Sequence, residues 1–216
     1  CSAVHASLYA DLIGVGADDA RAIDTLQDLY RPITEQSFNP PTFLPRPDGL
    51  DVVPFLTTDL ASAELIKYAA NSFLALKISF INEIAQLAET VGADITQIAK
   101  GIGLDSRIGT RFLQAGLGWG GSCFGKDTSA LISTAQEYGI AMPIVQAARV
   151  VNAARRAHVI EKLLKELKIL KGRTVTLLGL AFKPHTDDLR DAPALDIARK
   201  LVERGAKVRA HDPVSI

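Results

Sequence analysis

The longest uninterrupted segment of this chain runs from Asp59 to Val91, 33 residues without a glycine or a proline. Apolar residues recur along it at helical spacing, namely Leu65, Tyr68, Ala69, Phe73, Leu76, Phe80, Ile84 and Leu87. The segment predicts a helix about 50 Å long, and Gly92 suits the position just after its end. We expect this helix to be apolar on two faces, one against its own domain and one against a symmetry-related copy.

The segments before the long helix have strand, helix and loop patterns in turn. Residues 11–16 have the apolar content of a short buried strand, and residues 18–30 form a helical pattern with Asp18 as the expected N-cap. Residues 31–50 contain five of the ten prolines and are expected to be a loop. The extended stretch around Pro54 is expected at a sheet edge, because proline cannot donate to a central ladder.

The segments after the long helix change character at Lys171. Before it, shorter helices are expected at residues 94–100, 126–138 and 143–168. After it, a strand is expected at 174–180, a helix at 192–204 and a second strand at 207–211. Strand, helix and strand in this order are the half-unit of a parallel, doubly wound sheet. The predicted fold is therefore a mostly α central domain, flanked by partial α/β (Rossmann-like) segments.

Composition excludes several classes of function. Lysine plus arginine and aspartate plus glutamate number 24 each, so no overall basic field favours nucleic acid or anionic lipid. No apolar run is long enough for a membrane span, and no segment resembles a signal peptide. Cys1 and Cys123 offer neither a disulfide framework nor metal-ligand spacing. We expect a cytoplasmic protein without a metal, and, from ends that look cut at Cys1 and Ile216, a piece of a longer polypeptide.

Residues 118–127 read GWGGSCFGKD and place Cys123 in a glycine-rich loop before an expected helix. Glycines let the backbone approach a ligand closely. A thiol near a helix N-terminus and a cation such as Lys126 is readily available as a thiolate. A lone cysteine often packs as a small hydrophobe, but such a cysteine usually lies in a periodic apolar segment. We therefore interpret Cys123 as a nucleophile.

Two further groups of polar residues have less specific patterns. Glu64, Lys67 and Asn71 share one face of the long helix, which is equally typical of a solvated stripe and of a functional site. Lys183 and Arg190 follow the strand at 174–180, where doubly wound sheets bind ligands. The dinucleotide pattern G-x-G-x-x-G is incomplete there, so these two basic residues fit either phosphate binding or simple solvent exposure.

Four motifs, GWGGSCFGKD, ELIKYAANSFLALKISFINE (64–83), GIGLDSRIGTRFL (101–113) and GLAFKPHTDDLRDAPA (179–194), together resemble the UDP-glucose/GDP-mannose dehydrogenase family in order and spacing. The resemblance implies three parts: the tail of an NAD-binding domain (1–58), a helical central dimerisation domain (59–158) and the start of a UDP-binding domain (159–216). With most of the NAD-binding domain outside the sequence, the chain alone is expected to be inactive. Trp119 and Gly125 depart from the family's usual Phe and Pro, and the proline-rich stretch 34–48 is longer than usual.

The resemblance also implies a reaction and a set of site residues. UDP-glucose would be oxidised at its primary alcohol to a carboxylate in two NAD-dependent steps, with a thiohemiacetal and a thioester on cysteine. The catalytic residues would be Cys123, Lys67, Asn71 and Asp127. Substrate-binding residues would be Arg107, Phe112, Leu113, Gly118, Gly120, Gly121, Phe182 and Lys183, and cofactor-binding residues would be Arg190 and Lys126. Arg107 would reach the substrate of the partner subunit in a homodimer formed through the long helix.

Two alternatives remain at this stage. The sugar could be GDP-mannose or a UDP-N-acetylhexosamine, although the wording of residues 64–83 favours UDP-glucose. The chain could also be a non-catalytic dimerisation module that retains the site residues without their function.

Overall fold

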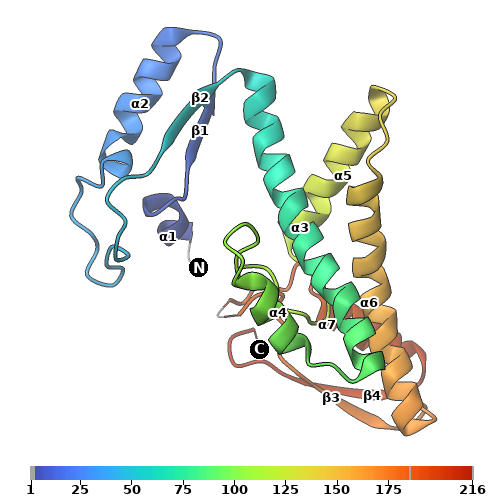
Figure 1. Ribbon diagram of the computed structural model, residues 1–216. Helices are drawn as coiled ribbons and strands as arrows, with labels where there is room; N and C mark the ends of the chain where they lie inside the picture. The colour runs from blue at the N-terminus through green and yellow to red at the C-terminus, as the bar shows by residue number, and fades with distance from the viewer. Residues whose placement is uncertain (1–2, 185, 216) are drawn as a thin grey trace. The chain divides into compact units, whose positions relative to one another are not determined.

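The computed structural model describes residues 3–184 and 186–215. The chain divides into two compact units, Cys1–Lys67 and Tyr68–Ile216, and the boundary falls inside the long helix α3 (Leu60–Val91). Figure 1 gives the course of the chain through its helices and strands. None of the described helices is both long enough and apolar enough to cross a membrane.

The first unit contains a small parallel sheet and the helix that connects its strands. β1 (Ile13–Gly16) pairs with β2 (Phe55–Thr58), and α2 (Ala20–Thr34) contacts both strands. Pro54 immediately precedes β2 and takes part only as an acceptor, since its carbonyl receives the N–H of Ile13 at 2.9 Å. The predicted strands on either side of α2 are thus both present.

Two local expectations in the first unit were wrong, and one helix was not expected at all. The N-cap of α2 is Asp19 and not Asp18, because the side chain of Asp19 accepts the N–H of Arg21 at 2.9 Å. α2 continues to Thr34 through Pro32, which removes one backbone N–H donor from the last turn of the helix. A short helix α1 (Ala3–Leu8), which periodicity over six residues cannot predict, precedes the sheet.

Most of α3 belongs to the second unit, and the predicted long helix is confirmed. Its buried residues are Ser72, Ala75, Ser79, Ile81, Asn82, Ala85 and Ala88. This inner face is small and partly polar, not apolar as expected. Small side chains let α3 approach α6 (Pro143–Leu167), where Ser79 Oγ donates to the carbonyl of Ala148 at 2.7 Å. The large apolar residues Phe73 and Phe80 of the predicted pattern are exposed instead.

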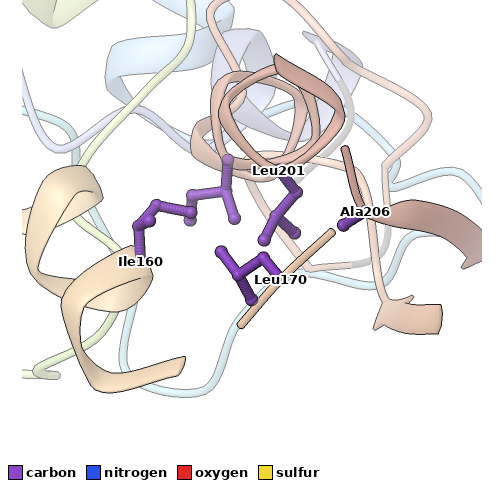
Figure 2. Packing of buried hydrophobic residues seen from close by; sticks show 5 residues of the cluster. Ile160, Leu170, Leu201 and Ala206 are labelled. Atoms are coloured by element: carbon purple, nitrogen blue, oxygen red, sulfur yellow. The ribbon is translucent and has the colours of Figure 1, made fainter. Parts of the chain in front are cut away.

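The C-terminal segment forms the predicted βαβ arrangement. β3 (Thr174–Leu178) and β4 (Lys207–His211) pair in parallel, and α7 (Pro193–Glu203) connects them and packs on α6. One hydrophobic cluster holds this arrangement, with Ile160, Leu170, Ile197, Leu201 and Ala206 at its centre. Figure 2 shows Ile160 of α6 facing Leu201 and Leu170 across this core. The C-terminal half of α6 therefore shares one core with the βαβ arrangement.

Candidate active site

Cys123 lies in the first turn of α5 (Ser122–Glu137). α5 begins four residues before the predicted start at 126, so the expectation that Cys123 lies in a loop ahead of the helix was wrong. The N-cap is Gly121, with φ of 81° and ψ of 169°, a backbone that residues with a Cβ rarely adopt. The thiol of Cys123 is free and exposed at the helix end where backbone N–H groups have no intrahelical partner.

Two cations, Lys126 and Arg190, interact electrostatically with Cys123. The pKa of Lys126 is raised, mainly by its ion pair with Asp127 and to a lesser degree by the charge of Cys123. The pKa of Arg190 is raised, mainly by its hydrogen bonds to Asp188 and slightly by Cys123. The same pairing lowers the pKa of Asp188 to about 2.

Asp127 connects α5 to α3. Its side chain is fully buried, and one carboxylate oxygen accepts a hydrogen bond from Asn71 Nδ2 at 2.6 Å. The other oxygen pairs with Lys126. Asn71, Lys126 and Asp127 therefore come together within one helical turn of Cys123. Lys67 is exposed and lies one turn before Asn71 on α3, at the end of the first unit.

Gly120 and Gly121 of the loop lie against other parts of the protein. A Cβ at position 120 would overlap the carbonyl oxygen of Asp191, and a Cβ at position 121 would lie 2.7 Å from the ring of Phe182. The N–H of Gly121 donates to the carbonyl of Arg190 at 2.9 Å. Gly120 and Gly121 thus allow the nucleophile-bearing loop to pack on the segment after β3.

Gly118 serves the same purpose on the α6 side. It has φ of 100°, and a Cβ there would lie 2.5 Å from Asn152 Oδ1. The next residue, Trp119, is buried, and its indole N–H donates to Ser79 Oγ at 3.0 Å. Its ring meets the ring of Phe124 edge-on at 6.1 Å. Contacts with α3 and α6 therefore hold this part of the loop in place.

Four predicted residues remain, Arg107, Phe112, Leu113 and Lys183. Phe112 has φ of 64° and its ring is 6.4 Å from that of Phe124. Leu113 is 3% exposed and lines a cavity of about 490 Å³ whose other lining residues are Ile95, Thr96, Ala99, Lys100, Thr110, Gln114 and Ala115.

The two cations among the remaining residues are both exposed. Arg107 is paired with Asp105 at 2.6 Å, and Lys183 follows β3. Residue 185 of the 179–194 motif lies outside the described residues.

Sequence reasoning missed two residues of α6 that hold the loop, Asn152 and Arg156. Asn152 is 4% exposed and contacts the backbone of Trp119, which Arg156 also contacts. An asparagine inside a helix is a signal in itself, because asparagine is a poor helix-interior residue. Among the residues that the structure describes, no group of three or more His, Cys, Asp or Glu side chains is arranged to hold a metal ion.

Comparison with known protein families gives two adjacent matches. Residues 61–154 match the central domain of the UDP-glucose/GDP-mannose dehydrogenase family. Residues 176–216 match the UDP binding domain of the same family.

Individual relatives agree over the whole chain. A UDP-glucose 6-dehydrogenase of Bacillus subtilis is 45% identical over 215 residues, covering 100% of this chain and 43% of the relative. A UDP-glucose 6-dehydrogenase of Haloferax volcanii is 42% identical, covering 99% of this chain and 46% of the relative. The structure of a UDP-glucose dehydrogenase from Pyrobaculum islandicum superposes with a TM-score of 0.88 at 42% identity, covering 99% of this chain and 45% of that one. The chain thus spans less than half the length of the relatives it matches.

Proposed function

Because the chain belongs to the UDP-glucose/GDP-mannose dehydrogenase family, we propose that it provides the nucleophile of a UDP-glucose 6-dehydrogenase, which converts UDP-glucose to UDP-glucuronate. The observation that carries the proposal is the exposed thiol of Cys123 in the first turn of α5, beside two cations and the Asn71–Asp127 pair. A thiol placed in this way is equipped for covalent catalysis. We place the protein in a reducing compartment, the cytoplasm, where such a thiol persists.

NAD is the cofactor that we propose, and the described residues fit one part of it. Lys126 and Arg190 are exposed cations beside Cys123, suited to a dianionic pyrophosphate. The turn after β3 does not suit a pyrophosphate, because the N–H groups of Leu180 and Ala181 already donate to the carboxylate of Asp212. We therefore assign cofactor contacts in this part of the chain to Lys126 and Arg190. When bound, NAD supplies the acceptor for the two hydrides that leave C6 of the sugar.

Cys123 binds C6 of the sugar covalently between the two oxidations. Its thiolate adds to the C6 aldehyde, a C–S bond forms, and the carbonyl oxygen takes a proton to give a thiohemiacetal. The second oxidation converts this adduct to a thioester. Water then adds to the thioester, the C–S bond breaks, and the thiolate returns as the carboxylate leaves. The sulfur is thus regenerated in each cycle.

The neighbours of Cys123 have distinct proposed roles. Asn71 and Lys67, one turn apart on α3, donate to the negative oxygen of the tetrahedral adducts. Asp127 holds Asn71 and Lys126 with its two carboxylate oxygens and positions the hydrolytic water. The exposed Lys183 and the Phe182 ring, at the end of β3, are proposed to meet the UDP part of the substrate. We keep the three-part division at 1–58, 59–158 and 159–216 as part of this proposal.

The test uses the complete protein with Cys123→Ser, and with Cys1→Ser as the matched control. We expect the control to form UDP-glucuronate and two NADH per sugar, and Cys123→Ser to stop before the carboxylate, because a serine ester is harder to form and release. UDP-glucose, GDP-mannose and a UDP-N-acetylhexosamine are compared as substrates. Normal turnover by Cys123→Ser would refute the role of the nucleophile, and preference for another sugar would refute UDP-glucose.

We also propose that the protein is a homodimer through α3. Phe73, Phe80 and Leu87 follow one another at seven-residue spacing, and all three are exposed, at 60%, 47% and 59%. Large apolar side chains in such a row are typical of a helix that pairs with a second helix. Light scattering at high micromolar concentration should show a dimer that Phe80→Glu dissociates and the exposed control Gln86→Glu does not. A monomeric parent chain, or a dimer unaffected by Phe80→Glu, would contradict this interface.

A further inference from the structure

One side chain of α6 holds both main-chain groups of the residue at the centre of the loop. The N–H of Trp119 donates to Asn152 Oδ1 at 2.7 Å, and Asn152 Nδ2 donates to the carbonyl of Trp119 at 3.0 Å. Asn152 is 4% exposed, so this pair of hydrogen bonds lies away from water. A reciprocal contact of this kind fixes the position and the orientation of the Trp119 backbone, which lies outside any helix or strand.

Arg156, one turn further along α6, reaches the same carbonyl and continues beyond it. Its guanidinium contacts the carbonyl of Trp119 at 3.4 Å, Asp191 at 3.5 Å and Asp196 at 3.7 Å. The side chain is 15% exposed. Arg156 thus ties the loop to the segment directly after Arg190 and to α7.

These contacts of α6 affect the position of Cys123 relative to Arg190. Cys123 lies four residues after Trp119, and the N–H of Gly121 between them donates to the carbonyl of Arg190. We propose that Asn152 and Arg156 are positioning residues, which fix the Trp119 backbone and so hold the thiol of Cys123 against the segment that carries Arg190. Their importance for turnover rests on the proposed function, whereas their effect on the thiol does not.

The experiment measures the rate at which iodoacetamide alkylates Cys123 in a Cys1→Ser background, so that one thiol reacts. Asn152→Asp keeps the shape but loses the Nδ2 donor, and Arg156→Lys keeps the charge but loses the guanidinium that reaches three partners. Asp191→Asn removes one ion-pair partner at a half-exposed site where φ is 47°, a backbone that asparagine tolerates. Ile160→Val is the matched control, because it loosens the core on the same helix without touching the loop.

Each of the three loop variants should lower the alkylation rate at pH 7 by about threefold or more, the size expected from losing one hydrogen bond. The reason is that a loosened Cys123 spends less time beside its cations. Ile160→Val should match the parent, because it leaves the contacts of the loop in place.

Parent-like rates at pH 7 in Arg156→Lys and Asp191→Asn would overturn the proposal, even if Asn152→Asp failed to fold. An equal loss of rate in Ile160→Val would overturn it as well, because the effect would then be one of general stability. If the loop variants slow alkylation but the complete protein oxidises no nucleotide sugar, the proposed function fails and the positioning role stands.

Discussion

Replacing Gly120 with alanine should destabilise the second unit, whereas the same change at Gly125, five residues away, should stabilise it. The backbone at neither position is left-handed, so the difference comes from the surroundings. A Cβ at position 120 would overlap the carbonyl oxygen of Asp191 and lie 2.8 Å from Pro193 Cδ. A Cβ at position 125 would meet only Asp191 Oδ2, at an ordinary 3.7 Å, and Gly125 lies inside α5.

The magnitudes follow from these contacts. Forcing a methyl group into a packed site costs about 1–3 kcal/mol, and relief is hard at position 120 because the obstacle is backbone. Alanine in place of glycine inside a helix gains roughly 0.5–1 kcal/mol. With a urea m-value of about 2 kcal/mol per M, Gly120→Ala should lower the unfolding midpoint by about 0.5–1.5 M. Gly125→Ala should raise it by roughly 0.25–0.5 M.

The chain offers its own probe for this assay. Trp119 is the single tryptophan and is buried in the loop itself, so its emission during urea unfolding reports on the region that both changes affect. Equal midpoints for Gly120→Ala and the parent chain would show that the loop does not pack tightly on the segment after β3. A loss of stability in Gly125→Ala matching that in Gly120→Ala would point to a general intolerance of the loop.

Two further changes test the polar contacts. Asn71→Ala should lower the free energy of unfolding by about 1.5–3 kcal/mol, because the buried carboxylate of Asp127 loses a hydrogen bond to a charged group; a cost near zero in urea unfolding would refute that pairing. Asp212→Asn should be less stable than the parent at pH 7, since N–H donors led by Leu180 and Val214 hold the pKa of Asp212 well below its ordinary value. A depressed pKa stabilises above the unfolded value of about 3.9, so the difference in urea midpoint should shrink as the pH falls below about 4, and a constant difference down to pH 2 would contradict this assignment.

The long helix shows how far periodicity reaches. Absence of glycine and proline predicted α3 to within one residue at its start, because backbone preference is local. Which face is buried depends on the neighbour. Phe73 and Phe80 form the more apolar row yet are exposed, while Ser79 and Asn82 are buried. Ser79 Oγ donates to a carbonyl of α6, and Asn82 Oδ1 accepts the N–H of Gly116. Apolar spacing alone does not distinguish a core face from a face that awaits another partner.

In the candidate site, too, the local sequence predicts some features, whereas others depend on residues that are distant in the sequence. The unusual context of Cys123, among glycines and followed by a lysine, was sufficient to single it out. The sequence does not show that Gly120 and Gly121 also accommodate Asp191 and Phe182, which lie more than 60 residues away. Contacts of this separation follow from the fold and leave no periodic signal.

A site assembled in this way is fixed before any ligand binds. Gly121 donates to the backbone of Arg190, and the segment with Arg190 leads directly into α7, whose Ile197 belongs to the core shared with α6. α6 also holds the loop through Asn152. One helix therefore fixes the positions of both Cys123 and the segment that carries Arg190. Groups that are already held in place lose little conformational entropy when the substrate binds, and this lowers the barrier of the reaction. Substitutions that displace α6 or α7 as a whole should therefore disturb the site, whereas the loss of one methyl group from their core, as in Ile160→Val, should not.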